Sequence, residues 1–521
     1  MIEMRHVLPG SWRHYVLFAA IIALGVFARV WEYRSLPPGL NQDDASNGVD
    51  AMSLYRYGTD RTGVPFPTRF VSWGSGQDAL YGYVLVPLIA VAGLSTTVVR
   101  LPALFAGILS LPLIYFIGRK LRGPDFGLLA MFLLAISPWH IVISRHALEA
   151  NLLPFLFMLG FACLLMTNIN NHWFVAACLI LGIALYSYIT SYLLIPFFLL
   201  IAIPALYIGR RISVGNLLAG ILLLAVLALP VVIYVIINSL GLPSVHLGPL
   251  TIPRLPSVSR ISTDVAIFQP APLQQLASSA RDLLYMLVFQ LDGPFNSTGW
   301  GYLYRFTFPL ILVGGWFVFR CPMDPVARRL LLVWLLAGLA VGVLVSPVFV
   351  HNNVLIIALI LLCAGFLEWM LIWKKTVFVL FAGLFLAVFL AFTLYYHSPD
   401  SIAQAQREYH AGLLSALDYA RTSTSGPICV VDDKIIMPYI FVLFSEKMTP
   451  DVGPDKIIYA DPTAQYRDVT SVGRYFFGTD HCPASPLPTY VMSFSEHSPL
   501  GANKTFETTR FGLFKVLVPL K

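Results

Sequence analysis

Long apolar stretches recur along this sequence from about residue 15 to residue 396, separated by short polar segments. A helix needs about 20 apolar residues to cross roughly 30 Å of hydrocarbon. Hydrophobic residues make up 57% of the chain and charged residues only 12%, so lipid and not water is its main solvent. We therefore expect an α-helical polytopic membrane domain over residues 1–397.

The sequence changes character at about residue 398. From there to Lys521, charged and polar residues are frequent, and short β-rich runs stand between Pro and Gly residues, which predicts a small α/β domain over residues 398–521. Cys429 and Cys482 both lie in this domain and can form a disulfide if it is extracytoplasmic. The other cysteines lie in or beside apolar runs, as small hydrophobic residues do.

The basic residues indicate the orientation. With the N-terminus in the cytoplasm, Lys and Arg gather in the short inner connections, as is typical of membrane proteins. This arrangement needs eleven spans, at about residues 15–33, 99–118, 125–143, 151–168, 173–189, 191–209, 215–237, 301–320, 329–346, 352–372 and 376–396. Because Lys and Arg lie in short clusters between apolar runs, we interpret the net charge of +7 as a topology signal and expect no nucleic-acid partner.

A further apolar run, Leu80 to Leu94, has about fifteen residues and is short for a span. We expect it to form a juxtamembrane helix in the outer interface. The outer side then holds residues 34–98, residues 239–300 and the C-terminal domain. The chemistry should lie on this side.

Two adjacent carboxylates, Asp43 and Asp44, stand in the first outer loop. Close like charges and apolar surroundings both raise the pKa of a carboxyl group, so one of the two is suited to take a proton from a hydroxyl group. In an equally supported interpretation, Asp43 caps a helix that begins near Ala45 and Asp44 favours its dipole. The residues alone leave both interpretations open.

Other ionisable residues of the outer side are candidates for binding a phosphate. Arg145 and His146 share a short turn with Glu149, which is suited to orient an acceptor or bind a divalent cation. The alternative is a solvated hairpin anchored by an interfacial tryptophan. Arg254, Arg260 and His351 are further candidate cations. The alternative for the two arginines is interfacial snorkelling, and the alternative for His351 is a structural role.

Several motifs are absent from the sequence: a Walker A loop, a dinucleotide-binding glycine fingerprint, His-Glu-x-x-His and Cys-x-x-Cys. Nucleotide-driven chemistry and a zinc motif are therefore not supported. The residues assign no cofactor. They neither require nor exclude the binding of a divalent cation.

Short motifs stand in a recognisable order along nearly the whole chain. They are Arg29 and residues 36–50, 99–102, 136–151, 185–188, 416–420 and 438–444. Together they resemble the bacterial and archaeal branch of the protein mannosyltransferase and aminoarabinose transferase superfamily. The resemblance implies a GT-C fold, in which a transmembrane bundle and juxtamembrane helices surround an outer active site.

The resemblance also implies a chemistry: inverting transfer of a sugar from a polyprenyl-phosphate carrier. Asp43 matches the catalytic aspartate of the family's first loop, and Asp44 stands where relatives usually have Glu. The sequence departs from many relatives at Gln77 and Ala79, in place of Lys and Pro, and after His351, where an Arg is missing.

We therefore expect a glycosyltransferase of the plasma membrane with Asp43 as general base and a protein, lipid or polysaccharide acceptor. A lipid-linked oligosaccharide ligase or polymerase is the nearest alternative. A transporter or flippase is disfavoured because the central spans are almost free of charge, whereas transporters carry ionisable residues at the midplane.

Overall fold

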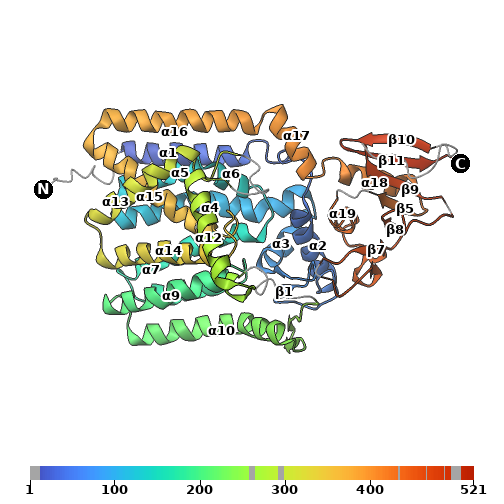
Figure 1. The fold of residues 1–521 in the computed structure, drawn as a ribbon, viewed down its shortest axis with the longest axis horizontal. Helices are drawn as coiled ribbons and strands as arrows, with labels where there is room; N and C mark the ends of the chain where they lie inside the picture. Colours follow the sequence, from blue (N-terminus) through green and yellow to red (C-terminus); the bar gives the residue numbers. More distant parts are fainter. Residues whose placement is uncertain are drawn as a thin grey trace. The chain divides into compact units, whose positions relative to one another are not determined.

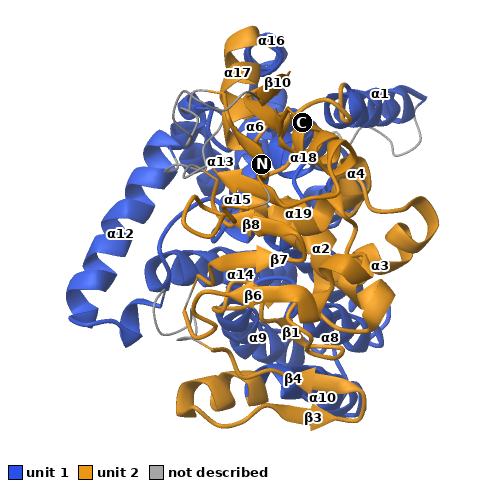
Figure 2. Cartoon of the chain, turned by 90° about the vertical axis from the view of Figure 1, so that its right-hand side faces the viewer, with its two compact units in different colours: residues 1–31, 103–232, 261–397 blue, residues 32–102, 233–260, 398–521 orange. Residues whose placement is uncertain are grey.

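The computed structural model of the chain describes residues 12–256, 265–291, 299–431, 435–464, 466–485, 487–494 and 506–520. The chain forms two compact units, each built from separate stretches of sequence (Figure 2). The first unit comprises residues 1–31, 103–232 and 261–397, and the second comprises residues 32–102, 233–260 and 398–521.

Long apolar helices dominate the chain (Figure 1). Among the described residues, eight are long and apolar enough to cross a membrane, which confirms the prediction of a polytopic α-helical protein. They are α1 (Trp12–Val30), α4 (Thr96–Arg122), the 3₁₀ turn η1 (Glu149–Leu152) continued by α7 (Leu153–Met166), α9 (Ser191–Ile208), α10 (Val214–Leu240), α14 (Pro325–Leu344), α15 (Asn353–Trp373) and α16 (Lys375–Tyr396).

Three of the eleven expected spans contain shorter helices: α5 (Pro124–Ala135), α8 (Trp173–Ala184) and α13 (Phe308–Arg320). At 1.5 Å per residue each is roughly 20 Å long or less, short of the hydrocarbon thickness. Helix α5 ends before Pro138, which opens the separate helix α6 (Pro138–Ile143), because proline has no N–H and restricts the residue before it. Eight of the eleven expected spans thus contain a long helix, and these three contain a shorter one.

Two further helices are not long apolar spans. Helix α3 (Leu80–Ala92) forms within the run expected not to span. Helix α12 (Pro272–Phe289) buries Ser279, Leu283 and Met286 on one face, while Leu273 and Leu284 are exposed. The spacing of the buried residues is that of an amphipathic helix.

Helices α13 and α15 of the first unit pack against each other through glycines. A Cβ atom on Gly314 would lie only 2.0 Å from the backbone oxygen of Leu362, and one on Gly365 would lie 2.7 Å from the oxygen of Gly314. Small residues let the backbones of membrane helices approach closely. A side chain at either position would force the two helices apart.

The second unit contains α2 (Gln42–Tyr57), α3, the N-terminal part of α4 and two small hairpins, β1 (Arg69–Phe70) with β2 (Gln77–Asp78) and β3 (Val245–Leu247) with β4 (Leu250–Ile252). Its C-terminal part begins with α17 (Pro399–Glu408) and contains α18 (Leu413–Ser423) and α19 (Tyr439–Ser445).

A seven-stranded mixed sheet forms the centre of the C-terminal part, in the order β10-β11-β9-β5-β8-β7-β6. Strand β5 pairs in parallel with β8 and β9, and the other pairs are antiparallel. Cys429 and Cys482 form a disulfide, and the expected α/β domain is present. The strands are β5 (Ile428–Val431), β6 (Ile457–Tyr459), β7 (Val469–Val472), β8 (Tyr475–Phe477), β9 (Thr489–Ser493), β10 (Phe506–Phe511) and β11 (Phe514–Pro519).

The contact between α13 and α15 predicts a large difference between two glycine substitutions. Gly314→Leu should destabilise the protein by roughly 1–3 kcal/mol or more, because the new side chain meets backbone atoms that cannot yield. Gly383→Leu on α16 is the matched control, since a Cβ there meets nothing within 4 Å. Thermal unfolding in detergent measures both, and an equal effect of the two would contradict the prediction.

Candidate active site

Helix α2 of the second unit carries the paired aspartates in its first turn. Asn41 is the N-cap, and its side-chain oxygen accepts a hydrogen bond from the backbone N–H of Asp44 at 2.8 Å. The interpretation in which Asp43 caps a helix beginning near Ala45 is therefore wrong, because the helix already begins at Gln42. Both aspartates lie where the helix dipole favours negative charge.

Asp44 is fully buried and paired with Arg100 of α4, which is also buried. The guanidinium Nε and Nη2 atoms of Arg100 both lie 3.0 Å from Asp44 Oδ2. Arg100 also donates hydrogen bonds to the carbonyl oxygens of Pro37 at 2.9 Å and Gly39 at 2.7 Å. One guanidinium group thus joins the loop before α2, the first turn of α2 and the start of α4.

Gly39 is required where the loop meets the C-terminal part of the unit. Its φ angle is +82°, and an added Cβ would lie 2.1 Å from the backbone oxygen of Tyr409. Only glycine satisfies both the left-handed backbone and the close approach.

Asp43 differs from Asp44 in its surroundings, although the two are adjacent. Its side chain is partly exposed, whereas that of Asp44 is buried. Successive residues of a helix point about 100° apart, so the carboxylate of Asp43 leaves the helix in another direction. Asp44 is held by Arg100 inside the unit, whereas Asp43 stands at a partly exposed position.

A second buried ion pair, Asp50 with Arg61, lies further along α2. The backbone N–H of Arg61 donates to Asp50 Oδ1 at 3.0 Å, and the guanidinium lies 3.4 Å from Oδ2. Burial raises the pKa of Asp50 to about 6, although the charge of Arg61 acts to lower it. Sequence analysis did not single out this pair, because eleven residues and a loop separate its members.

Gln77, one of the departures from the related family, is buried beside this pair. Its side-chain oxygen accepts hydrogen bonds from Ser46 at 2.8 Å and Ser72 at 3.1 Å, and both serines accept one from Arg61. The guanidinium group of Arg61 is thus connected, through a serine hydroxyl, to the side chain at position 77, where many relatives carry a lysine.

The C-terminal part packs directly on α2 through α19. A Cβ atom on Gly48 would lie 2.8 Å from the ring of Phe444, and the Tyr57 hydroxyl donates to the backbone oxygen of Met448 at 2.7 Å. The C-terminal part thus supports the helix that carries the aspartates.

In the first unit, Arg29 and Arg145 bind backbone carbonyls. Arg29 of α1 donates to the oxygens of Leu134 and Ala135 at the end of α5, and to His140 Nδ1 at 2.7 Å. An arginine is always a donor, so Nδ1 of His140 accepts. Arg145, which is also buried, donates to the oxygens of Ala28 and Trp31 at the end of α1. Both arginines thereby satisfy the open carbonyls of a helix end.

Glu149 and the segment after His351 come together in the first unit. Glu149 is buried at the start of η1, and Asn353 donates to the backbone oxygen of the next residue, Ala150, at 2.8 Å. His351 is partly exposed, and its Nδ1 donates to the backbone oxygen of Ser346 at 2.6 Å. Its Nε2 is the ring nitrogen that this hydrogen bond leaves to other partners.

The remaining candidates are distributed as follows. His146, like Arg145, Glu149 and His351, belongs to the first unit, whereas Asp43, Asp44 and the exposed Arg254 belong to the second. Arg260 lies outside the described residues. Within the described ranges, no three or more His, Cys, Asp or Glu residues form a group that can hold a metal ion.

Comparison with known proteins gives one family match. The family model of dolichyl-phosphate-mannose-protein mannosyltransferases matches residues 79–237, which confirms the resemblance seen in the sequence. No curated protein matches the chain.

Solved structures show the same fold over most of the chain. ArnT from Cupriavidus metallidurans bound to undecaprenyl phosphate has a TM-score of 0.56 and 15% identity, covering 98% of each chain. The archaeal oligosaccharyltransferase AglB from Archaeoglobus fulgidus, in complex with an inhibitory peptide and a dolichol-phosphate, has a TM-score of 0.51 and 13% identity, covering 83% of this chain and 64% of that chain. The expected GT-C fold is therefore shown.

The burial of Asp50 predicts a pH-dependent stability. Because the folded protein binds the Asp50 proton more tightly than the unfolded chain, this group stabilises the fold below about pH 4, and the contribution is lost as the pH rises through 6. Relative to Asp50→Asn, the wild type should lose up to roughly 3 kcal/mol between pH 4 and pH 7. Unfolding in detergent across this range measures the difference.

The exposed Asp480 provides the control for this experiment. Asp480→Asn removes the same charge from an exposed position. The stability of this variant should follow that of the wild type at every pH. A constant difference between wild type and Asp50→Asn across the range would contradict the prediction.

Proposed function

We propose that this chain is an inverting glycosyltransferase that moves a sugar from a polyprenyl-phosphate-linked donor to an acceptor on the extracytoplasmic side of the plasma membrane. The observation that carries the proposal is the first turn of α2. There, Asp44 is buried and held by Arg100, while the adjacent Asp43 is partly exposed. We assign Asp43 as the general base.

The proposed reaction is a displacement at the anomeric carbon. The acceptor hydroxyl oxygen forms the new bond to that carbon, the bond to the phosphate oxygen breaks, and the phosphate leaves on its polyprenyl carrier. The hydroxyl proton passes to the carboxylate of Asp43 as the new bond forms. Attack from the face opposite the leaving group inverts the configuration at this carbon.

The leaving phosphate gains negative charge, so cations beside it lower the barrier. We assign this role to residues from the set Arg145, His146, Arg254, Arg260 and His351. The guanidinium group of Arg145 donates hydrogen bonds to the backbone oxygens of Ala28 and Trp31 at the end of α1. These hydrogen bonds fix its position.

The known proteins with this fold support a lipid-phosphate donor. ArnT is bound to undecaprenyl phosphate in one structure, and AglB is bound to a dolichol-phosphate and a peptide in another. We propose a polyprenyl phosphate of this class for the present chain. A protein, a lipid or an envelope polysaccharide serves as acceptor, with Glu149 orienting it or binding a divalent cation.

The proposed orientation follows from the distribution of charge. Basic residues end α4 and begin α14, which supports a cytoplasmic position for these helix ends. The N-terminus is then cytoplasmic, and the C-terminal part of the second unit is extracytoplasmic. The disulfide between Cys429 and Cys482 fits an oxidising compartment.

A second candidate function is that of an oligosaccharide ligase, because AglB shares the fold. Such an enzyme takes a glycan from a pyrophosphate-linked carrier. The two candidates differ in the donor, so one assay with both donors separates them.

The proposal predicts a specific loss of activity in one variant. Purified protein, a synthetic polyprenyl monophosphate sugar with a radiolabel and a membrane extract as acceptor should yield labelled product. Asp43→Asn should lower the rate by at least about a hundredfold, because it removes the base. Since Asp43 is partly exposed, the unfolding temperature of the variant should stay that of the wild type.

Asp480→Asn, on the surface of the C-terminal part, is the matched control and should keep full activity. Full transfer by a folded Asp43→Asn variant would refute the assignment of the base. Transfer only from a pyrophosphate-linked oligosaccharide would favour the ligase.

A further inference from the structure

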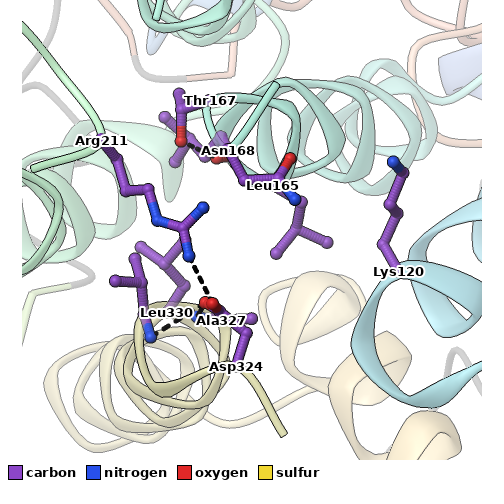
Figure 3. A pocket seen from close by; sticks show the side chains of 10 residues that line it. Lys120, Leu165, Thr167, Asn168, Arg211, Asp324, Ala327 and Leu330 are labelled. Carbon is purple, nitrogen blue, oxygen red and sulfur yellow. Dashed lines mark hydrogen bonds and ion pairs between the residues drawn. The ribbon is translucent and has the colours of Figure 1, made fainter. Parts of the chain in front are cut away.

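A small pocket in the first unit is lined by residues at helix ends and by none of the candidate residues described above (Figure 3). It encloses about 310 Å³ of empty space, part of which is open to solvent. The ends of α4 and α7, the start of α14 and the residues after α9 line it. Its polar lining consists of Lys120, Thr167, Asn168, Arg211 and Asp324, and leucines of α7 and α14 form the apolar wall.

The acidic residue of the pocket is already engaged. Asp324 pairs with Arg211 and also caps α14, accepting hydrogen bonds from the backbone N–H groups of Val326 at 3.1 Å and Ala327 at 2.9 Å. Thr167 donates to the backbone oxygen of Leu164 at 2.6 Å. The pocket therefore has little remaining capacity to neutralise a further cation.

Lys120 lines the pocket on the side opposite Arg211 (Figure 3). Its ammonium group lies 5.6 Å from the centre of the Phe116 ring. Within the described part of the chain, no ion pair includes Lys120. Lys120 and the remaining N–H groups of Arg211 thus supply donors on two sides of one space.

The same end of the first unit is strongly basic. The ion pair between Arg122 and Glu368 joins the ends of α4 and α15 there, and the pocket joins the ends of α4 and α7 to the start of α14. The acidic residues here include Asp125 at the start of α5, Asp324 and Glu368, of which Asp324 and Glu368 form ion pairs. The basic residues are Arg119, Lys120, Arg122, Arg210, Arg211, Arg320, Arg328, Arg329, Lys374 and Lys375.

We infer that this pocket binds the headgroup of an anionic phospholipid. The headgroup phosphate lies between Lys120 and Arg211, beside the apolar wall of the pocket. An amphiphile fits this site better than a free anion, because one wall is apolar and the pocket lies at the ends of membrane-spanning helices. The inference does not depend on the proposed transferase activity.

Lipid binding to the purified full-length protein in detergent tests the inference. Native mass spectrometry with added phosphatidylglycerol should show one tightly retained molecule, bound at least about tenfold more tightly than phosphatidylcholine. Lys120→Gln should weaken phosphatidylglycerol binding at least about fivefold, and Lys120→Arg should restore it. Lys120 is partly exposed, so the unfolding temperatures of both variants should match that of the wild type.

Lys375→Gln is the control, since Lys375 is exposed at the same end but does not line the pocket. Its effect should stay below about twofold. Equal losses of phosphatidylglycerol binding in Lys120→Gln and Lys375→Gln would overturn the inference. They would show that the lipid is attracted by the overall positive charge and not by a defined site. Retention of phosphatidylcholine as tightly as phosphatidylglycerol, or displacement of the lipid by millimolar inorganic phosphate, would overturn it as well.

Discussion

The guanidinium group of Arg100 holds three parts of the second unit together: the loop at Pro37 and Gly39, the first turn of α2 and the start of α4. Removing two charges from water costs several kcal/mol per ion, and only good geometry with further hydrogen bonds offsets that cost. Arg100 meets the condition through its contacts with Asp44 and two carbonyl oxygens. The first turn of α2 is fixed as a result.

The position of Asp43 depends on this anchor. A general base must lie within hydrogen-bond reach of the proton that it takes, so its backbone has to be held while its carboxylate stays accessible. Asp44 provides the first condition, and the partial exposure of Asp43 provides the second. The packing of α19 on α2 extends the support into the C-terminal part, which gives that part a structural role close to the proposed chemistry.

Much of the architecture was predictable because it follows from local composition. Long apolar runs define membrane-spanning helices, and the change in character near residue 398 marks the α/β part. The short helices were harder to predict. Pro138 opens α6 with only two residues between it and the end of α5, so a count of apolar residues does not detect the break.

The site was predictable only in part, for a related reason. The sequence places Asp43 and Asp44 side by side but cannot separate their roles, since the difference arises from Arg100, 56 residues away. The cap was misplaced by two residues, because Asn41 and Asp43 are both good caps and the helix begins earlier than expected. Asp50 and Arg61 escaped notice because only the folded loop brings them together.

A double-mutant cycle between Asp44 and Arg100 tests the central claim most directly. The free energy of unfolding in detergent would be measured for wild type, Asp44→Asn, Arg100→Gln and the double variant. If the pair anchors α2, each single variant should lose roughly 3–5 kcal/mol, and the double variant should lose less than the sum by at least about 1 kcal/mol. Strictly additive losses would contradict the claim, because they would show that the two residues stabilise the fold independently.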